Sequence, residues 1–341
     1  MMRGQLLAAA KSMGLFKLAR AATAPAVRIL CYHGLWLGEG TFSGDQLFMS
    51  PATFSRRMDT IKRLGYPVIS LDDAIQGIRG RRALPANAVV ITFDDGWYSS
   101  HWGMGPKLKE LGFPATLYCD TQQMSRSGPV PHVMAEYLAK ACNIDATAAP
   151  VAPAFKAATN LDRSHEDRLA SVHEFATAAG IDIAPYLQRR VFDYMTADEL
   201  RDLRAGGVDI QLHTHRHELG DFSRAKIVTE IEDNRRALSA ILNIDPKTLR
   251  HFCYPSGEWV AAASPVMDEL DIESATTSDR GLAWPMAQRH SLARLSDGGE
   301  ISDLKFEADL CGFTDLVKAA VSRTQRWTAL NGDLALARIP R

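Results

Sequence analysis

The 341-residue sequence lacks long apolar runs, paired cysteine motifs and an excess of charge of either sign. A membrane-spanning helix needs about 18 consecutive apolar residues, and no stretch of the sequence reaches that length. Lysine and arginine total 39 against 40 acidic residues, which gives a formal net charge of -1. A nucleic-acid-binding protein normally carries a basic face or stripe, so nucleic acid is not an expected partner.

The sequence also gives no sign of a disulfide framework. It contains five cysteines, an odd number without any CxxC pair: Cys31, Cys119, Cys142, Cys253 and Cys311. Because this usage is typical of a reducing compartment, we expect the protein in the cytoplasm. Three of the cysteines lie in apolar, strand-like runs, where a buried free thiol is expected rather than a catalytic one.

The first 27 residues form a basic segment, with no acidic residue before Glu39. Lys11 and Lys17 interrupt the apolar stretch that a secretory signal would need, so we do not assign one. Two interpretations stay open for this segment. It packs on the fold as a helical cap, which we favour, or it docks on the inner face of the membrane through its positive charge.

From residue 28 to about residue 300, strand-like apolar runs alternate with helical segments. Repeated βα units of this kind predict a parallel sheet or barrel. The short run 67–71, PVISL, is one further candidate strand. The rhythm breaks over about 121–194, which reads as a helical insertion, and residues 301–341 form a C-terminal helical tail.

Titratable side chains follow several of the predicted strands. His33, the pair Asp94 and Asp95, and His213 each close an apolar run, and Tyr254 closes another. In parallel α/β folds the active site lies at the carboxyl ends of the strands. The sequence therefore predicts a functional site at this one edge.

A metal ion explains these residues best. Two adjacent carboxylates at the end of a buried strand repel each other and are costly unless a cation pairs with them. His213 and His217 lie four residues apart, at a strand end and in the loop beyond it. Two imidazoles and one carboxylate make the three-ligand set of catalytic zinc, with a position left for water. We expect Zn²⁺, although Co²⁺ or Ni²⁺ suits similar ligands.

The motifs TFDDG (92–96) and HTHRH (213–217), taken together, resemble those of the polysaccharide deacetylases, the chitin-deacetylase-like or NodB homology family. RHFCYPSG (250–257) is similar to the Arg and Tyr-Pro motif of that family. LCYHGL (30–35) resembles a feature of its bacterial glycan-deacetylase branch. The matches cover roughly residues 28–296 apart from the insertion.

The resemblance implies an α/β fold, a distorted (β/α) barrel with fewer than eight strands, that is, a deformed TIM-like barrel. It also implies metal-dependent removal of acetyl groups from sugars. The residues that match the metal ligands of the family are Asp95, His213 and His217.

The same resemblance implies three catalytic roles. Asp94 matches the catalytic base, and Arg250 matches the residue that braces the base. Tyr254 matches the residue whose backbone N–H helps to stabilise the oxyanion. The chemistry agrees, because a divalent ion activates water and polarises a carbonyl while a neighbouring carboxylate removes the proton.

The sequence departs from the family at the general acid. The expected Leu-x-His motif reads SLARLSDGG, with Arg294 at the position of the histidine. An arginine is not a proton donor at neutral pH. His33, His101, His290 or metal-bound water are the alternatives, and we favour His33 because it ends a strand at the right edge.

We therefore expect a metal-dependent hydrolase that removes acetyl groups, most of all N-acetyl groups, from a sugar of a bacterial surface polysaccharide or glycolipid precursor. Two alternatives stay open: a catalytically weak or silent carbohydrate-binding relative, and a deacylase of a non-sugar amide. Three residues beside the motifs are expected to line the sugar cleft: Trp97, Pro255 and Trp259.

Overall fold

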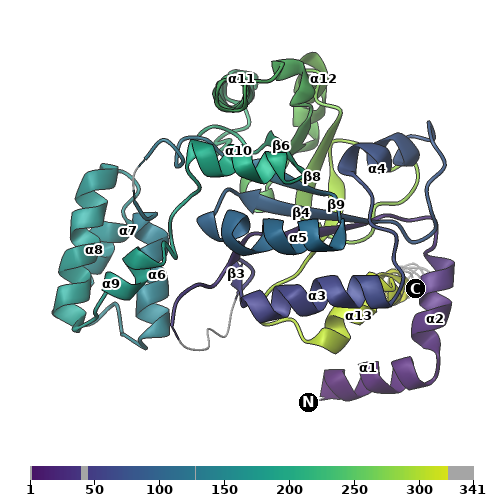
Figure 1. Cartoon of the computed structure of the whole chain (residues 1–341), viewed down its shortest axis with the longest axis horizontal. Helices are drawn as coiled ribbons and strands as arrows, with labels where there is room; N and C mark the ends of the chain where they lie inside the picture. The colour runs from purple at the N-terminus through teal and green to yellow at the C-terminus, as the bar shows by residue number, and fades with distance from the viewer. Residues whose placement is uncertain (1, 40–44, 127, 322–341) are drawn as a thin grey trace, which may run out of the picture.

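Seven parallel strands close into a barrel in the computed structural model, which describes residues 2–39, 45–126 and 128–321 (Figure 1). The order around the barrel is β1-β4-β5-β6-β7-β8-β9. The strands are β1 Arg28–Tyr32, β4 Val89–Asp95, β5 Ala115–Cys119, β6 Val208–Leu212, β7 His251–Cys253, β8 Ser274–Arg280 and β9 Leu292–Ser296. The predicted barrel with fewer than eight strands is confirmed.

Helices cover the outside of the barrel, and their ends carry the expected signals. They are α3 Pro51–Arg63, α4 Leu71–Ile78, α5 Gly105–Leu111, α10 Ala197–Ala205, α11 Arg224–Leu242 and α12 Ser264–Glu269. The Ser50 hydroxyl accepts the N–H of Thr53 at the start of α3, and Thr196 forms a capping box with Glu199 at the start of α10. Short connections between the strands include the π-helix η1 Ser100–Met104 and the 3₁₀ turns η2 Pro246–Thr248, η3 Pro255–Gly257 and η4 Ala261–Ala263.

The run 67–71, expected as a strand, forms only a single bridge, between Val68 and Val89. The expectation was wrong because Ser70 caps a helix: its side chain accepts the N–H of Asp73, and α4 begins at Leu71. A separate two-stranded sheet pairs β2 Gly34–Leu35 with β3 Phe48–Met49 above the end of β1.

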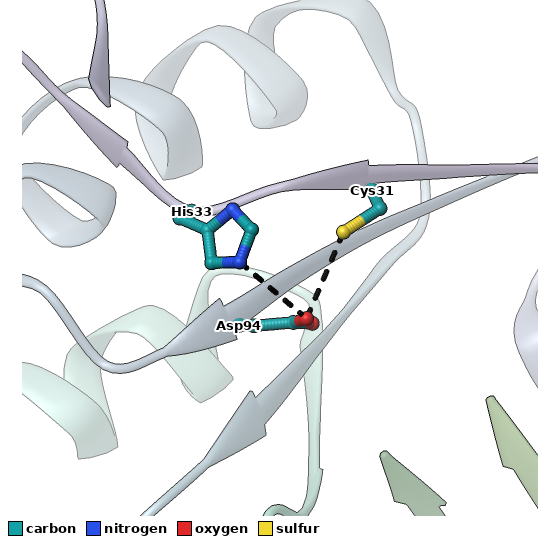
Figure 2. Close-up of side chains that lie close together, drawn as sticks. All are labelled: Cys31, His33 and Asp94. Atoms are coloured by element: carbon teal, nitrogen blue, oxygen red, sulfur yellow. Dashed lines mark hydrogen bonds and ion pairs between the residues drawn. The ribbon is translucent and has the colours of Figure 1, made fainter. Parts of the chain in front are cut away.

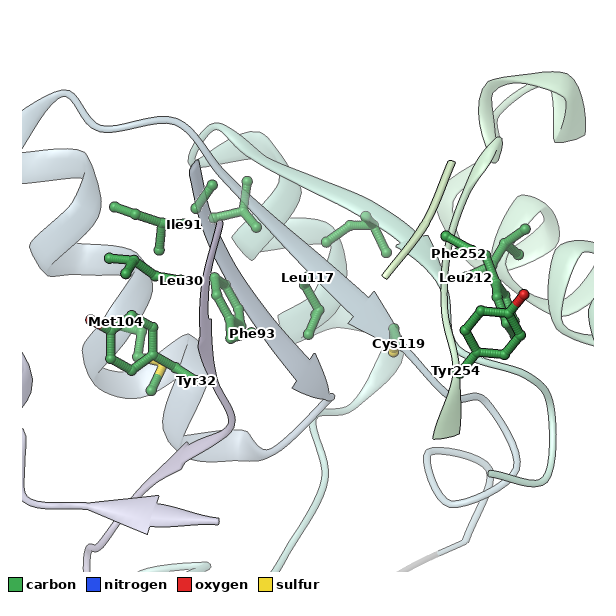
Figure 3. Close-up of a cluster of buried hydrophobic side chains, with 14 of the residues drawn as sticks. Leu30, Tyr32, Ile91, Phe93, Met104, Leu117, Cys119, Leu212, Phe252 and Tyr254 are labelled. Carbon is green, nitrogen blue, oxygen red and sulfur yellow. The ribbon is translucent and has the colours of Figure 1, made fainter. Parts of the chain in front are cut away.

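The strands divide their side chains between two environments. Figure 3 shows the outer set, in which Leu30, Ile91, Phe93 and Leu117 pack in one buried cluster under the helices. Because side chains alternate along a strand, the residues between them point the other way, into the barrel. Asp94 belongs to this inner set, which places a carboxylate inside the barrel.

Four helices fill the part of the chain predicted as an insertion. They are α6 Pro131–Ala141, α7 Ala152–Thr159, α8 His165–Ala179 and α9 Ala184–Gln188, and they stand together at one side of the barrel (Figure 1). Their apolar side chains share one buried cluster with Trp36 and Phe48 from the segment after β1. The insertion therefore packs beside the carboxyl end of the barrel.

The two ends of the described chain pack together. Helices α1 Met2–Ser12 and α2 Leu15–Ala22 contact α13 Asp303–Leu310, where Phe16 and Ala19 meet Ala308 and Cys311. The buried Arg28 guanidinium donates to the carbonyls of Thr23 and Leu310 at 2.8 and 3.0 Å, which fastens both ends to β1. A further helix spans 313–321, and the rest of the predicted tail, 322–341, lies outside the described residues.

Within the described ranges, each helix is too short or too polar to cross a bilayer. The five cysteines are free thiols: Cys142 is exposed, and the other four are buried.

Candidate active site

Three predicted metal ligands converge at the carboxyl edge of the barrel. Asp95 ends β4, His213 follows β6, and His217 lies in the loop beyond. The Nε2 atoms of both histidines lie 3.4 Å from Asp95 Oδ1. We call Asp95, His213 and His217 the metal triad.

The geometry of the metal triad fits a tetrahedral ion. Bonds of about 2.0–2.1 Å at tetrahedral angles put neighbouring ligand atoms about 3.3 Å apart, close to the separations observed. The Nδ1 of His213 lies 2.8 Å from the Cys253 carbonyl oxygen, so it carries the proton and leaves Nε2 as the donor atom. The indole N–H of Trp97 donates to Asp95 Oδ2 at 2.8 Å, which leaves Oδ1 for an ion.

Unusual backbone angles bring these ligands together. Asp95, Thr214 and His217 have φ values of 79°, 65° and 59°, in the left-handed region that side chains with a Cβ rarely adopt. Each such residue costs about 1–3 kcal/mol and persists only where its surroundings impose it. Strain at three positions around one set of ligands is typical of a functional site.

The electrostatics of the metal triad are those of a site for a cation. Burial acts to raise the pKa of Asp95, but hydrogen bonds from His213 and His217 outweigh it and hold the pKa well below its usual value. Burial acts to lower the pKa of His213, yet its contacts with Asp95 and Asp94 raise the pKa overall. The carboxylate is therefore ionised, and its negative charge would stabilise a bound divalent ion.

In the part of the chain that the structure describes, two other groups of side chains have metal-ligand spacing: Cys31, His33 and Asp94, and Asp94, His213 and Cys253. Both depend on Asp94, whose two oxygens already accept hydrogen bonds from the Arg294 guanidinium. A cation placed there would meet that positive charge. The metal triad is therefore the most favourable of the three groups.

Asp94 is held by Arg294 inside the barrel. Nη1 and Nη2 of Arg294 donate to Oδ1 and Oδ2 of Asp94 at 2.8 and 2.7 Å, and only 3% of each side chain is exposed. Their strands, β4 and β9, are not neighbours in the barrel, so this contact crosses its interior. Burial acts to raise the pKa of Asp94, but the charge and hydrogen bonds of Arg294 hold it below the ordinary value.

Arg250, expected to brace Asp94, lies elsewhere. It immediately precedes β7, at the amino end of the barrel, where its guanidinium contacts Asp72 at 2.6 Å and Glu273 at 3.4 Å. These two carboxylates hold the guanidinium at the amino end, whereas Asp94 lies near the carboxyl end of β4, and β5 and β6 separate β4 from β7 in the barrel. Arg294 makes the contact that the resemblance assigned to Arg250.

His33 stands next to Asp94, as Figure 2 shows. Its Nε2 lies 3.9 Å from Asp94 Oδ2, and its Nδ1 lies 3.0 Å from the Gln46 carbonyl oxygen. Cys31, two residues earlier on β1, approaches the same carboxylate oxygen at 3.7 Å. His290 lies apart, with its Nε2 2.9 Å from the Ile272 carbonyl oxygen, and His101 lies on η1.

Two further expectations do not match the positions observed. The backbone N–H of Tyr254 donates to the Thr276 carbonyl at 3.1 Å, because the strand ladder between β7 and β8 extends to this residue. It is therefore not free to act as an oxyanion donor in this conformation. Trp97 is 2% exposed and orients Asp95 rather than lining a cleft.

Pro255 is buried in η3, and Trp259 is half-buried, with its indole N–H 2.9 Å from Asp279. Both follow the carboxyl end of β7.

One acid in this region was not predicted from the sequence: Asp120, which follows β5 and donates its N–H to the Asp95 carbonyl at 3.1 Å. Burial raises the pKa of Asp120 to about 7. The rule that polar residues follow strands would have found it.

The chain matches a family model described as polysaccharide deacetylase over residues 81–275. It is 36% identical over 75 residues to the poly-beta-1,6-N-acetyl-D-glucosamine N-deacetylases of Escherichia coli K12 and O157:H7, a match that covers 21% of this chain. The matching part spans only 11% of the length of these relatives.

Solved structures show the same fold at low sequence identity. The deacetylase PplD of Streptococcus pyogenes, solved with acetate, is 17% identical, has a TM-score of 0.58, and aligns over 84% of this chain and 99% of its own. IcaB of Ammonifex degensii is 15% identical, with a TM-score of 0.57 over 85% and 98% of the two chains. Since the family model matches more than half of the sequence and the barrel agrees, the chain belongs to the polysaccharide deacetylase family.

Proposed function

We propose that this protein is a metal-dependent hydrolase that removes acetyl groups, chiefly N-acetyl groups, from a sugar of a bacterial surface polysaccharide or glycolipid precursor. The observation that carries the proposal is the ionised carboxylate of Asp94, fixed by Arg294 directly beside the metal triad. The E. coli relatives support the substrate class, because their names give an N-acetylated glucosamine polymer as substrate.

The metal triad would hold the ion, and zinc suits its two imidazoles and one carboxylate best, with Co²⁺ or Ni²⁺ as alternatives. Such an ion, when bound, supplies Lewis-acid polarisation and lowers the pKa of coordinated water. The protein contributes the orientation: the Cys253 carbonyl fixes the His213 ring, and Trp97 fixes the Asp95 carboxylate. Such supporting contacts commonly change metal affinity by about 10–100-fold.

Asp94 is the proposed general base. Each of its oxygens accepts one hydrogen bond from Arg294, and Oδ2 also faces the thiols of Cys31 and Cys253. Oδ1 therefore has the second lone pair with which to accept a proton from water. Arg294 keeps the group ionised and fixes its plane. We therefore assign to Arg294 the positioning role that the sequence assigned to Arg250.

His33 is the proposed general acid. A carbonyl oxygen only accepts hydrogen bonds, so the contact with Gln46 requires the proton of His33 to be on Nδ1. The Nε2 atom then lies toward Asp94, 3.9 Å from its Oδ2. In the proposed step Nε2 carries the proton that passes to the departing amine. Removal of this group should slow the breakdown of the tetrahedral adduct, in which the carbon–nitrogen bond breaks and nitrogen takes the proton.

The activity is tested by Asp94→Asn. We expect zinc-dependent acetate release from N-acetylated oligosaccharides, reduced about 100–10,000-fold in Asp94→Asn because the base is lost. Asp72→Asn, which changes a half-exposed aspartate at the amino end of the barrel, is the matched control and should keep the rate. Acetate measured enzymatically is the readout. Zinc binding without any release from sugars would favour a carbohydrate-binding relative, and release only from simple amides would favour the non-sugar deacylase.

The assignment of His217 as a metal ligand is tested with two substitutions in the HTHRH motif, residues 213–217. His217→Ala should weaken zinc binding by more than about 100-fold, because a direct ligand is lost. His215→Ala should leave it nearly unchanged, since the His215 Nδ1 lies 2.8 Å from the Thr121 hydroxyl and not at the metal triad. Titration calorimetry with zinc and metal-stripped protein measures both. Equal losses in the two variants would refute this ligand set.

The role of Arg294 is tested by Arg294→Met. Removal of the cation leaves a buried carboxylate unpaired, which should lower the free energy of unfolding by about 3–5 kcal/mol. It should also lower kcat about 100-fold through misplacement of the base, with KM little changed. Arg294→Lys should recover part of the rate. Arg224→Met removes an exposed ion pair with Glu269 and should cost under about 1 kcal/mol.

Urea denaturation, zinc calorimetry and initial rates measure these effects, and retained zinc affinity shows that the metal triad is intact. A double-mutant cycle with Asp94→Asn isolates the coupling between the two side chains. Full activity in Arg294→Met would disprove the positioning role.

We also propose a peripheral contact with anionic lipid at the inner face of the membrane. Among the described residues, several exposed large apolar side chains lie on the terminal segments: Leu6 on α1, Met13 in the turn after it, Leu18 on α2, and Val317 and Val321 on the 313–321 helix. The exposed Lys17 adjoins Leu18, and the sequence has no acid before Glu39. Basic residues near an anionic surface each contribute about 1 kcal/mol.

Lipid binding is tested by sedimentation with vesicles. Vesicles containing phosphatidylglycerol should bind the protein, and vesicles of phosphatidylcholine alone should bind it much less. The double variant Leu6→Asp, Leu18→Asp should lose most of this binding, whereas Leu161→Asp, equally exposed but on the insertion, should keep it. Failure of the wild type to bind anionic vesicles would leave the terminal helices as a cap only.

A further inference from the structure

Helix α11 carries two buried polar side chains on the face that packs against the barrel. Glu230 and Asn234 are both 0% exposed and lie one helical turn apart. Apolar side chains of the same helix, Ile227, Ile231 and Leu238, belong to the main buried cluster around them. A polar group in such surroundings costs free energy unless it is hydrogen-bonded. The hydrogen bonds of both side chains lead to the metal triad.

The carboxamide of Asn234 joins the ends of two neighbouring strands. Its Oδ1 accepts the N–H of His213, which follows β6, at 3.0 Å. Its Nδ2 donates to the carbonyl of Cys119, which ends β5, at 3.0 Å. The register between β5 and β6 ends with the pair of Cys119 and Leu212. Because a carboxamide has the donor and the acceptor of a peptide group, Asn234 continues the ladder where the direct pairing of the two strands ends.

This bridge fixes His213 relative to Asp95. Cys119 is paired with Asp95 in the register between β4 and β5, and the N–H of the next residue, Asp120, donates to the Asp95 carbonyl at 3.1 Å. Asn234 therefore connects His213, through the end of β5, to the strand that carries Asp95. A change in this bridge would alter the separation of 3.4 Å between His213 Nε2 and Asp95 Oδ1.

Glu230 holds the loop between the two histidine ligands. Its Oε2 accepts the backbone N–H groups of Arg216 and His215 at 2.8 and 3.2 Å, and its Oε1 accepts from Arg216 Nη1 at 2.9 Å. Thr214 and His217, which flank these two residues, have φ values of 65° and 59°. Such backbone angles persist only where the surroundings impose them, and the contacts with Glu230 supply part of that restraint.

We propose that Asn234 and Glu230, here named the α11 clamp, are positioning residues of the metal triad. Asn234 fixes His213 relative to Asp95, and Glu230 fixes the loop that carries His217. The α11 clamp thereby determines how tightly, and in what geometry, the metal triad binds a divalent ion. This inference rests on the metal-binding part of the proposed function and does not depend on the identity of the substrate.

The α11 clamp is tested by zinc titration of metal-stripped variants. Asn234→Ala and Glu230→Ala should each weaken zinc binding about 10–100-fold, the usual effect of removing a group that supports a metal ligand. Glu230→Gln keeps an oxygen for the two backbone N–H groups and should restore most of the affinity lost in Glu230→Ala. Gln211→Ala is the matched control. This buried carboxamide accepts the N–H groups of Arg250 and His251 around the start of β7, and within the described part of the chain its hydrogen bonds do not reach the metal triad.

Two further readouts separate positioning from stability. Gln211→Ala should lower the midpoint of urea denaturation about as much as Asn234→Ala, since each leaves buried polar groups unpaired, yet it should keep the zinc affinity of the wild type. The visible absorption spectrum of the Co²⁺-loaded protein reports the coordination geometry. Asn234→Ala should change this spectrum, whereas Gln211→Ala should keep it.

Wild-type zinc affinity in Asn234→Ala or in Glu230→Ala, or an equal loss in Gln211→Ala, would overturn the proposal. If Asn234→Ala does not fold, the zinc affinities of Glu230→Ala and Glu230→Gln decide. None of these measurements needs turnover. Absence of acetate release by the wild type would therefore count against the proposed function, while the zinc affinities would still decide on the α11 clamp. A wild type that binds neither zinc nor cobalt would refute both.

Discussion

Asp94 and Asp95 can both lie at the end of the buried strand β4 because the backbone directs their carboxylates toward different partners. The pleat of β4 directs Asp94 into the barrel, where it meets Arg294. At Asp95 the chain leaves the strand conformation with a φ of 79°, and that carboxylate lies with His213 and His217. Each carboxylate is paired with its own positively polarised partners, so the electrostatic repulsion between the two neighbouring acids is largely offset.

The barrel makes this division possible. A closed ring of parallel strands brings residues of non-neighbouring strands into contact across its interior, and β4, β7 and β9 meet there through Asp94, Cys253 and Arg294. The residues that follow the parallel strands all lie at the carboxyl end of the barrel, which brings them close together. The residues with strained backbone angles at this edge are held in place by the strand ladder and by buried hydrogen bonds. The stability of the barrel therefore offsets the conformational free energy that these residues cost.

The βα rhythm and the helix caps are local signals and were sufficient to predict a parallel sheet or barrel, and the resemblance to the family selected the distorted barrel. The sequence also predicted that Asp95, His213 and His217 would lie together, as they do, since strand ends share an edge whatever the detailed packing. It could not identify the partner of Asp94, because that contact joins strands about 200 residues apart and depends on barrel order and on the inward face of β9. Similarity of motifs placed the bracing role on Arg250, although the position of Arg250 before β7 puts it at the opposite end.

The arginine at the place of the expected histidine changes the charge of the centre as well as its proton chemistry. Asp94 and Arg294 together are neutral, so a divalent ion with Asp95 and two neutral imidazoles would leave the centre with one net positive charge. With a neutral histidine at position 294, the Asp94 charge would cancel it. A reaction that develops one negative charge on an acyl oxygen is favoured by the positive centre. In the proposed reaction Arg294 would therefore favour the oxyanion and leave proton donation to another group, for which we propose His33, whose Nε2 lies 3.9 Å from Asp94 Oδ2.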